Sequence, residues 1–340
     1  MHSILLPAEW HPQSAIQLTW PHIGTDWIDI IDEVTTFYVG LSKEIIKHTQ
    51  LLIVCDKAED IKKHFTSTEQ KKIILVEIES NDTWSRDHGP ISVFIDGKPA
   101  IYDFGFNAWG LKFAANHDNK ITQKLFAKSI FAKEVTYHNY LNFILEGGAI
   151  DSDGEGTLLT TSKCLLAPNR NQPLTKGEIE VFLKKTLGLE QVLWLNHGYL
   201  SGDDTDNHID TLARFCSKDT IAYIQCTDKS DEHYQELKKM EDELATFRRL
   251  NGKPYNLIPL PMAKPIYEDE YRLPATYANF LIMDKVVLMP TYGSDKDSIA
   301  MEQLQKAFPN KEIIDIDCRT LIKQHGSLHC ITMQYPINFI

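Results

Sequence analysis

The chain has 340 residues, of which 43% are hydrophobic and 24% are charged, and this composition is typical of a globular protein with a sizeable core. Its net charge of −12 disfavours nucleic-acid binding, which usually requires a basic face. No apolar run approaches the roughly 20 residues of a membrane span. We also expect no secretion signal, because the first ten residues are interrupted by Pro7 and Glu9.

The six cysteines are scattered and include no CxxC pair, which predicts reduced thiols in a cytoplasmic protein. Five of them are expected to fill the core, and one is a candidate nucleophile. No linker rich in Ser, Gly or Pro and no low-complexity tract interrupts the sequence. We therefore expect a single continuous domain over residues 1–340.

Short apolar segments typical of strands alternate with segments of helical periodicity. Strands are predicted at 51–55, 73–78, 91–95, 99–104, 156–166, 191–195, 220–226, 280–290 and 313–316. Helices are predicted at 34–49, 176–187, 232–250 and 297–308. The helix at 232–250 carries acids and bases at i,i+4 spacing, which indicates a solvated face with a structural role. No glycine-rich phosphate-binding motif follows a strand, so nucleotide binding is not predicted.

Residues 82–90, DTWSRDHGP, place two acids, an Arg and a His around a Trp between two predicted strands. A plain connecting loop needs turn formers rather than a Trp among four ionisable groups. The segment therefore indicates a pocket that holds a charged ligand against an aromatic face. The alternative is a capped turn with internal salt bridges.

A carboxylate followed by two glycines, Glu146-Gly147-Gly148, comes after the apolar residues 143–145. Glycines at this place let a ligand or another stretch of backbone approach closely. The alternative is a β-bulge next to an incidental Glu.

Residues 201–215, SGDDTDNHIDTLARF, combine a His with several acids. His208 and Asp210 are two residues apart, so on a strand their side chains would share one face. A His beside carboxylates retains its proton more strongly and can serve as a general acid and base. A solvated acidic loop and a metal site are the alternatives. The metal site requires a third and usually a fourth ligand, which no HExxH-type spacing supplies.

Residues 326–330, GSLHC, lead through a turn of small residues into Cys330, at the start of the apolar run 331–333. A thiol in this position could face a cavity, and its thiolate would need an electropositive environment. The alternative is an inert cysteine in the core.

Five predicted strand ends carry conspicuous polar or reactive residues, namely Asp87, Glu146, His208, Asn279 and Cys330, separated by 59, 62, 71 and 51 residues. This recurrence suggests similar modules that each contribute one strand end to a shared centre. Together the residues supply a nucleophile, a proton shuttle and carboxylates. Two carboxylates suit a guanidinium, whose N–H fork matches their oxygens, and a thiolate can attack the guanidinium carbon.

At this point the chain resembles the agmatine deiminase family, also called the Porphyromonas-type peptidyl-arginine deiminases. The matching segments are NDTWSRDHGP (81–90), FGFNAWG (104–110), EGG (146–148), CLLAPNRN (164–171), DDTDNHIDTLARF (203–215), PATYANF (274–280) and GSLHC (326–330). They run in family order across nearly the whole chain. The resemblance implies the pentein fold, an α/β fold of five ββαβ-type modules in a pseudo-fivefold propeller around a central active site.

The resemblance also implies the catalytic residues. Cys330 corresponds to the nucleophile that forms an amidino-cysteine intermediate, and His208 corresponds to the general acid and base. Asp87 and Asp210 correspond to the carboxylates that grip the guanidinium. Arg86, which would alternate away from Asp87 along an extended segment, is expected to brace its loop.

The remaining site residues implied by the resemblance bind the substrate. Trp84 corresponds to an aromatic wall, Trp109 to a second aromatic face and Glu146 to an acid at the rim of the site. Asp204 is placed to hold the distal amine of the substrate, and Asn279 matches a site position of the wider family.

Two segments depart from the family pattern. Asn207 stands where the family often has a Gly, and the turn 324–327 before the Cys is poorer in Gly than usual. Neither change removes a reacting group, but both affect loop shape and therefore bear on the choice of substrate.

The implied activity is hydrolysis of agmatine to N-carbamoylputrescine and ammonia, without a metal or an organic cofactor. Peptidyl-arginine and free arginine are alternative substrates, although the acid-rich loop 203–206 disfavours the carboxylate of free arginine. Metal-dependent hydrolysis and a non-catalytic binding module are alternatives of other classes. The sequence does not determine the oligomeric state, and a homo-oligomer is compatible with it. Polyamine synthesis and the use of agmatine as a nitrogen source both fit.

Overall fold

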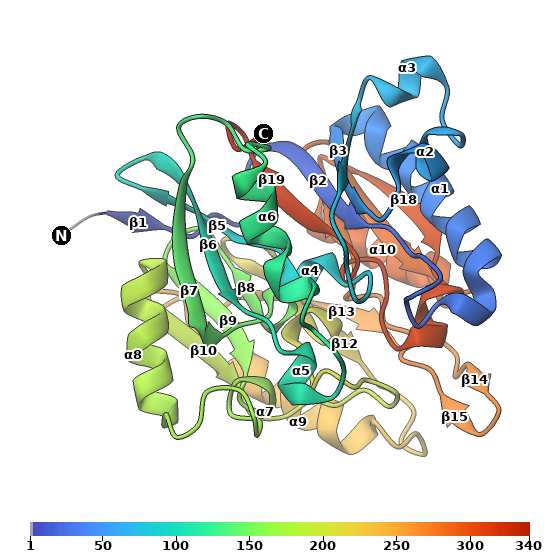
Figure 1. Cartoon of the computed structure of the whole chain (residues 1–340). Coiled ribbons are helices and arrows are strands. Elements are labelled where there is room, and N and C mark those ends of the chain that lie inside the picture. Colours follow the sequence, from blue (N-terminus) through green and yellow to red (C-terminus); the bar gives the residue numbers. More distant parts are fainter. Residues whose placement is uncertain (1–2) are drawn as a thin grey trace.

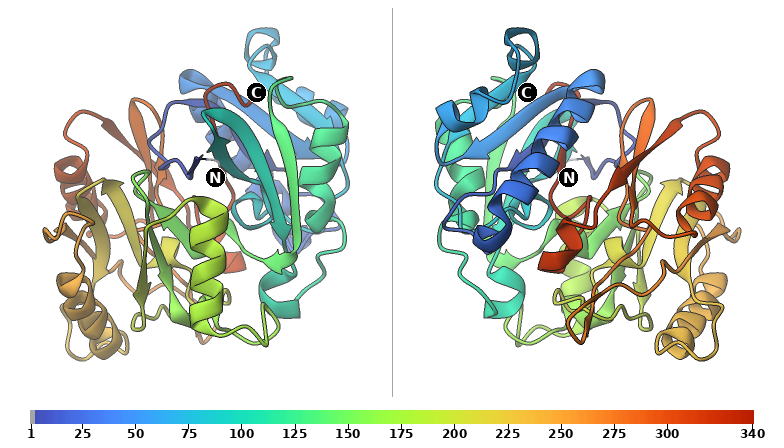
Figure 2. Two further views of the ribbon diagram at one scale, coloured as in Figure 1. Left: turned by 90° about the vertical axis from the view of Figure 1, so that its left-hand side faces the viewer. Right: turned by 90° about the vertical axis from the view of Figure 1, so that its right-hand side faces the viewer.

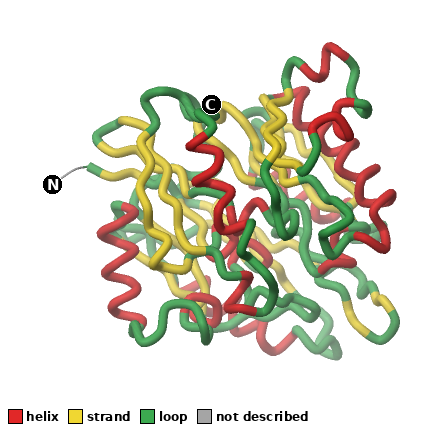
Figure 3. Tube along the Cα trace, in the orientation of Figure 1, coloured by secondary structure: helices red, strands yellow, loops and turns green. Residues whose placement is uncertain are grey.

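The computed structural model describes residues 3–340, and the strands of this part of the chain form six sheets. Five sheets contain three or four strands, and the sixth is the small hairpin of β14 (Tyr267–Glu268) and β15 (Tyr271–Arg272). The longer helices lie on the outside of the molecule in Figures 1 and 2. The strands occupy the space between them, as the colouring of Figure 3 shows. The result is a mixed α/β fold.

The first sheet joins the two ends of the chain. It contains β19 (Met333–Pro336), β2 (Gln13–Thr19), β3 (Gln50–Cys55) and β4 (Ile73–Glu77), in that order. β2, β3 and β4 are parallel, whereas β19 runs antiparallel to β2. The helix α1 (Ile31–His48) connects β2 to β3, and its buried positions 34, 38, 41 and 45 form one apolar stripe.

The second sheet contains β1 (Ile4–Leu5), β5 (Ile91–Ile95), β6 (Lys98–Gly105) and β7 (Thr136–Ile144). β5 and β6 form a hairpin whose two-residue turn, Asp96-Gly97, has positive φ at both positions. Asp-Gly is the sequence that such a turn favours, because its backbone twist matches that of the strands. The helix α6 (Ile121–Ala127) precedes β7, which runs parallel to β6.

The other three sheets contain three strands each, and in each of them a hairpin is followed by a helix and a parallel strand. The elements are β8 (Ile150–Ser152), β9 (Thr157–Thr161), α8 (Lys176–Leu187) and β10 (Gln191–Leu195); β11 (Ala213–Ser217), β12 (Thr220–Gln225), α9 (Tyr234–Thr246) and β13 (Asn256–Pro261); and β16 (Leu281–Ile282), β17 (Val286–Thr291), α10 (Asp297–Ala307) and β18 (Glu312–Asp317).

Short helices occupy several connections. They are α2 (Ala58–Lys62), α3 (Ser67–Gln70), α4 (Ser85–His88), α5 (Ala108–Leu111) and α7 (Ser162–Leu165), with the 3-10 turns η1 (Ile28–Ile30), η2 (Asp118–Lys120), η3 (Gly147–Ala149), η4 (Ile209–Thr211) and η5 (Leu321–Gln324). In the described residues, no helix is both long and apolar enough to cross a membrane.

Local sequence signals explain the bounds of α8. Thr175 and Glu178 form a capping box at its N-terminus, and Gly188 ends it in the left-handed conformation. A Cβ at Gly188 would lie 2.0 Å from the carbonyl oxygen of Ile4. A glycine at position 188 therefore allows the helix to end in the left-handed conformation and allows β1 to lie close against it.

Most of the predicted elements are confirmed, and 91–95, 176–187 and 191–195 have the bounds observed for β5, α8 and β10. Three predictions are wrong in extent. The strand predicted at 156–166 ends at Thr161, whose side chain caps α7. The strand predicted at 280–290 is a hairpin of two strands, and the helix predicted at 232–250 ends at Thr246.

The recurrent polar residues lie between sheets. Asp87 follows β4, Glu146 follows β7, His208 follows β10, Asn279 follows β15 and Cys330 follows β18, and in each case the next strand belongs to a different sheet. The prediction that they stand at strand ends is wrong for Asp87, which lies in α4, for His208, which precedes η4, and for Cys330, which lies in a turn between β18 and β19. The recurrence itself reflects five successive connections between sheets.

Candidate active site

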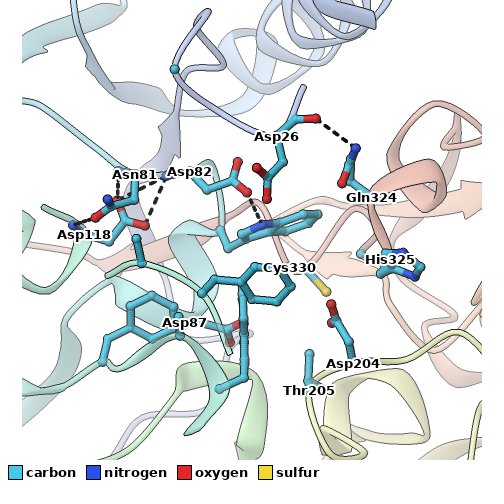
Figure 4. Close-up of a pocket in the computed structure, with 18 residues that line it drawn as sticks. Asp26, Asn81, Asp82, Asp87, Asp118, Asp204, Thr205, Gln324, His325 and Cys330 are labelled. Atoms are coloured by element: carbon cyan, nitrogen blue, oxygen red, sulfur yellow. Dashed lines mark hydrogen bonds between the residues drawn. The ribbon is translucent and has the colours of Figure 1, made fainter. Parts of the chain in front are cut away.

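A cavity of about 340 Å³ brings together segments that are distant in the sequence. Its walls come from residues 24–26, 81–87, 106–118, 204–205 and 324–330. Figure 4 shows the carboxylate of Asp204 next to the sulfur of Cys330, with the carboxylates of Asp26 and Asp82 close to each other and further from the sulfur. Five aspartates line the cavity, and none of its lining residues is a Lys or an Arg. The cavity therefore favours a cation.

Of the nine predicted site residues, five line this cavity, namely Trp84, Asp87, Trp109, Asp204 and Cys330. His208, Asp210, Asn279 and Glu146 do not line it. All four are buried. His208, Asp210 and Asn279 contact residues that line the cavity, whereas Glu146 lies behind His208.

Cys330 lies in the turn before β19 and is only 5% exposed. Its Sγ is 3.3 Å from Nδ2 of Asn279 and 3.9 Å from Oδ2 of Asp210. Burial, together with the charges of Asp210 and Asp87, raises the pKa of the thiol well above its ordinary value. The free protein therefore holds a thiol, and a cation beside the sulfur would favour the thiolate.

Asn279 ties the Cys330 turn to the loop that carries Asp210. Its Oδ1 accepts hydrogen bonds from the backbone N–H groups of His329 (2.8 Å) and Cys330 (3.3 Å). Its Nδ2 is 3.3 Å from the carbonyl oxygen of Asp210. Asn279 therefore sets the position of the sulfur relative to the carboxylate.

Both oxygens of Asp87 are held by donors from other segments. Oδ1 accepts from the backbone N–H of Gly148, and Oδ2 accepts from Nε1 of Trp109, each at 3.0 Å. Burial raises the pKa of Asp87 to about 6. A Cβ at Gly148 would lie 2.8 Å from Asp87 Oδ1 and 2.5 Å from Nδ1 of His208, so the predicted close approach at this glycine is confirmed.

His208 and Asp210 flank the start of η4 and do not lie on a strand, so the prediction that they share a strand face is wrong. The 3-10 turn nevertheless places both beside Asp87. Nδ1 of His208 is 3.5 Å from Oδ1 of Asp87. Burial opposes protonation of His208, but Asp87, Cys164 and Glu146 together outweigh it and raise its pKa well above the ordinary value. His208 is therefore a proton donor at neutral pH.

Asp210 is an ionised carboxylate with one open oxygen. Burial alone would raise its pKa, but the hydrogen bond and charge of His329 lower it below its ordinary value. Oδ2 of Asp210 is 2.8 Å from Nδ1 of His329. Oδ1 is buried and has no hydrogen-bond partner in the protein. A buried carboxylate oxygen without a donor is an expected contact for a ligand N–H group.

Sequence reasoning missed the buried charges behind Asp210. Nε2 of His329 is 2.6 Å from Oε2 of Glu9, and the same oxygen of Glu9 accepts from Nη2 of Arg214 at 2.6 Å. Arg214 Nε also pairs with Asp151 at 3.1 Å. The two ring nitrogens of His329 thus bridge the carboxylates of Asp210 and Glu9. The one signal in the sequence was that His329 directly precedes Cys330.

Glu146 is not at the rim of the site, and that expectation is wrong. It is fully buried, and both of its oxygens accept from Nε of Arg170, at 3.0 and 3.2 Å. Glu146, Cys164 and His208 are the described residues whose ligand atoms lie close enough together for a metal ion. Both oxygens of Glu146 already accept from Arg170, so neither is free to hold a metal ion.

The two tryptophans meet edge to face, with ring centroids 6.4 Å apart. Nε1 of Trp84 donates to Asp82 at 2.9 Å, and Gly326 lies against the Trp84 ring, where a Cβ would approach to 2.1 Å. Asp204 lies on the opposite loop, and burial together with the charge of Asp203 raises its pKa to about 6. The cavity thus has aromatic walls with acids beyond them.

Arg86 braces the loop, as expected, although it does so from a helical turn rather than an extended segment. Its Nη1 donates to Oε1 of Gln334 at 2.7 Å, and its Nε points to the carbonyl oxygen of His329 at 3.4 Å. Its backbone N–H also donates to the carbonyl oxygen of Cys330 at 3.1 Å. The segment that carries Asp87 is thereby fastened to the segment that carries the thiol.

Comparison with known proteins identifies relatives over the full length. A protein from Porphyromonas gingivalis, provisionally named an arginine deiminase, is 53% identical with a TM-score of 0.96, and 99% of each chain is covered. An agmatine deiminase from C. jejuni, solved with substrate bound, is 40% identical with a TM-score of 0.91, covering 98% of this chain and 96% of its own. A Vibrio parahaemolyticus protein provisionally named an agmatine deiminase is 34% identical, covering 97% of this chain and 96% of its own.

The family model for Porphyromonas-type peptidyl-arginine deiminases matches residues 5–336, which is nearly the whole chain and includes every residue of the cavity. The predicted resemblance is therefore confirmed, and the chain belongs to the Porphyromonas-type peptidyl-arginine deiminase family.

Proposed function

We propose that the protein is an agmatine deiminase, a hydrolase that converts agmatine and water to N-carbamoylputrescine and ammonia. The observation that carries the proposal is the cavity, which places a buried thiol among aspartates and is lined by no Lys or Arg. A substrate that is cationic at both ends meets an attractive charge throughout such a cavity.

The guanidinium binds between Asp87 and Asp210 in this proposal. The unpartnered Oδ1 of Asp210 accepts an N–H group of the substrate, and the ionised Asp87 supplies the second carboxylate. The positive charge of the guanidinium lies beside Cys330 and offsets the burial that otherwise keeps the sulfur protonated. The tryptophan rings form the walls against which the planar cation lies.

The reaction then proceeds in two halves. With the guanidinium bound, the Cys330 thiol releases its proton to solvent, and the resulting thiolate forms a bond to the guanidinium carbon. His208 gives a proton to the departing nitrogen, so that the carbon–nitrogen bond breaks, ammonia leaves and an amidino thioether remains. His208, now neutral, takes a proton from water, whose oxygen attacks the same carbon. The carbon–sulfur bond breaks, and the thiolate and the ureido product are released. No metal or organic cofactor takes part.

The remaining predicted residues have supporting roles in the proposal. Asp204 holds the distal amine, because it lines the cavity on the loop that faces the tryptophans. Asn279 positions the nucleophile through its bonds to the Cys330 turn. Glu146, which is buried beside His208, supports the charge of that ring rather than touching the substrate.

Arginine is the second candidate, because the P. gingivalis relative at 53% identity is named for it. Free arginine carries a carboxylate where agmatine has none, and the cavity lining offers that carboxylate no Lys or Arg. A blocked arginyl peptide also lacks the distal amine. Ammonia release from agmatine, arginine and a blocked arginyl peptide therefore tests the proposal. We expect agmatine to give the highest kcat/KM, and a higher value for arginine would overturn the assignment.

We further propose that the five larger sheets are the modules of a pseudo-fivefold propeller within a single domain. Each contains at least one antiparallel and at least one parallel pairing, with a helix in the parallel connection, which is the pattern of a repeated unit. The five connections between them carry the five recurrent site residues. The proposed compartment is the cytoplasm, a choice supported by six free, buried cysteines.

A further inference from the structure

The short element α5 has the opposite hand to every ordinary helix. Its four residues, Ala108, Trp109, Gly110 and Leu111, have φ of 51°, 55°, 89° and 69°. The backbone N–H groups of Leu111 and Lys112 donate to the carbonyl oxygens four residues earlier, at 2.8 and 3.1 Å. The segment is therefore one turn of left-handed helix. L-residues disfavour this conformation, and of the four only Gly110 adopts it without a steric penalty.

This turn delivers Trp109 to the active site. Nε1 of Trp109 donates to Oδ2 of Asp87 at 3.0 Å, and its ring packs edge-on against Trp84 and Phe106. A right-handed turn from the same starting residue would send the side chain in another direction, because handedness determines where Cβ points. The orientation of one carboxylate of the site thus depends on an unfavourable backbone conformation.

Two asparagine side chains hold the turn. Oδ1 of Asn107 accepts from the backbone N–H of Gly110 at 3.0 Å, and its Nδ2 donates to the carbonyl oxygen of Asn169 at 2.7 Å. Nδ2 of Asn169 in turn donates to the carbonyl oxygen of Gly110 at 3.2 Å. Gly110 lies so close to this partner loop that a Cβ would be 2.9 Å from the carbonyl oxygen of Pro168. The amide pair thus binds both backbone polar groups of Gly110, the residue that follows Trp109.

We propose that Asn107 and Asn169 are positioning residues, which hold the left-handed turn at 108–111 against its intrinsic preference and thereby aim Trp109 at Asp87. The consequence for catalysis rests on the proposed function, in which Asp87 grips the guanidinium. The handedness of the turn and the role of the amide pair in holding it do not depend on the substrate.

The first experiment tests the handedness through stability alone. Leu111 is 68% exposed, so replacing its side chain removes little packing. We expect Leu111→Gly to be more stable than Leu111→Ala, by a factor on the order of ten in the unfolding equilibrium constant, because glycine has no steric penalty at positive φ. The matched control is Val181 in the right-handed helix α8, which is 67% exposed. At this position we expect Val181→Ala to be more stable than Val181→Gly, because alanine favours a right-handed helix. The same order at both positions, with alanine ahead, would overturn the proposal.

The second experiment tests the amide pair through catalysis. We expect Asn169→Ala to lower kcat/KM for agmatine by about tenfold or more, because the turn relaxes and Trp109 leaves Asp87. The acidic limb of the pH profile should also move to higher pH, since the lost hydrogen bond had favoured ionised Asp87. Adding Leu111→Gly to Asn169→Ala should restore part of the loss, whereas adding Leu111→Ala should not.

Each outcome of the second experiment decides one point. The positioning role would be overturned if Asn169→Ala kept the wild-type kcat/KM and the wild-type acidic limb of the pH profile. Equal rescue by glycine and by alanine at position 111 would also overturn it. Should Asn169→Ala fail to fold, Asn107→Asp replaces it, because this variant retains the acceptor for Gly110 and loses the donor to Asn169. A wild-type protein without activity on agmatine would refute the proposed function, while the stability comparison would still decide the handedness of the turn.

Discussion

Cys330 is the residue on which the proposed chemistry depends most directly. Its environment is unusual for a reactive cysteine, because the nearest ionisable groups are carboxylates rather than cations. Thiols are ordinarily activated by a neighbouring Lys, Arg or protonated His. Here the charge that favours the thiolate arrives with the substrate, so a bound guanidinium and an active nucleophile occur together.

Replacing Cys330 by Ser should abolish ammonia release from agmatine, because an alcohol in the same place is a much weaker nucleophile than a thiolate. The variant should still bind agmatine, since Asp87 and Asp210 remain. Steady-state ammonia assays and calorimetric titration measure the two properties separately. Turnover at the wild-type rate would refute the assignment of the nucleophile.

The pH dependence of kcat/KM should report Asp87 together with Asp204. Burial raises the pKa of each to about 6, so both carboxyls become protonated as the pH falls through 6 and no longer attract the two ends of the substrate. We expect kcat/KM to fall by at least about tenfold per pH unit below that value. The acidic limb of kcat should lie at lower pH, because bound substrate favours the ionised carboxylates. A kcat/KM that stays flat between about pH 5 and 7 would contradict this role.

At the scale of elements, the connections between sheets do the positioning. Asp87 lies in a helical turn, His208 precedes a 3-10 turn that contains Asp210, and Gly148 lies in another 3-10 turn. Such short turns are tighter than strands, and the absence of a side chain at Gly148 lets these three turns meet. The close approach at Gly148 is what allows a His and two carboxylates to share one small volume.

Gly148→Ala should therefore impair catalysis more than stability. The new Cβ would lie 2.5 Å from Nδ1 of His208 and 2.8 Å from Oδ1 of Asp87, so the acid–base group must move. A displacement of this size costs about a hundredfold in rate. Gly177→Ala in α8 is the control, because nothing lies within 4 Å of its Cβ and alanine favours the helix. Equal kcat/KM for both variants would show that Gly148 has no such role.

At the scale of the whole molecule, a buried charge network joins the start of the chain to its end. Glu9 precedes β2, Asp151 and Arg214 belong to β8 and β11, and His329 precedes the nucleophile. The charges alternate in sign, so each is compensated by a partner. Removing one member of such a network leaves another charge buried and uncompensated.

Glu9→Gln should lower the free energy of unfolding by about 3–5 kcal/mol at neutral pH for this reason. Burial alone would raise the pKa of Glu9, but Arg214 and His329 depress that pKa below its ordinary value. The ionised Glu9 therefore stabilises the folded protein at pH values above its ordinary pKa, and this stabilisation is lost as the pH falls toward the depressed pKa. The stability gap between wild type and variant should therefore narrow below about pH 4.5. Denaturant unfolding at several pH values measures this gap. A gap that widens on acidification would contradict the assigned charges.

Much of the site was predictable from residue types, and the misses have common causes. Cys330, Asp87, Trp84, Trp109 and Asp204 all line one cavity, as the motifs indicated. The placement of Glu146 at the rim was wrong, because nothing in the sequence revealed its pairing with a residue 24 positions away. Glu9 and His329 were missed as well, because their partners are 205 and 119 residues distant in the chain.

The sequence by itself determined the family, the chemistry of the reacting groups and the bounds of the most strongly patterned elements, because motifs, caps and periodicity are local properties. Only the tertiary structure decided which carboxylate is ionised, which oxygen is left open for a ligand and which hand the 108–111 turn adopts. These depend on burial and on hydrogen bonds between distant segments, and the strength of both is set by what packs around them rather than by the neighbouring residues in the chain.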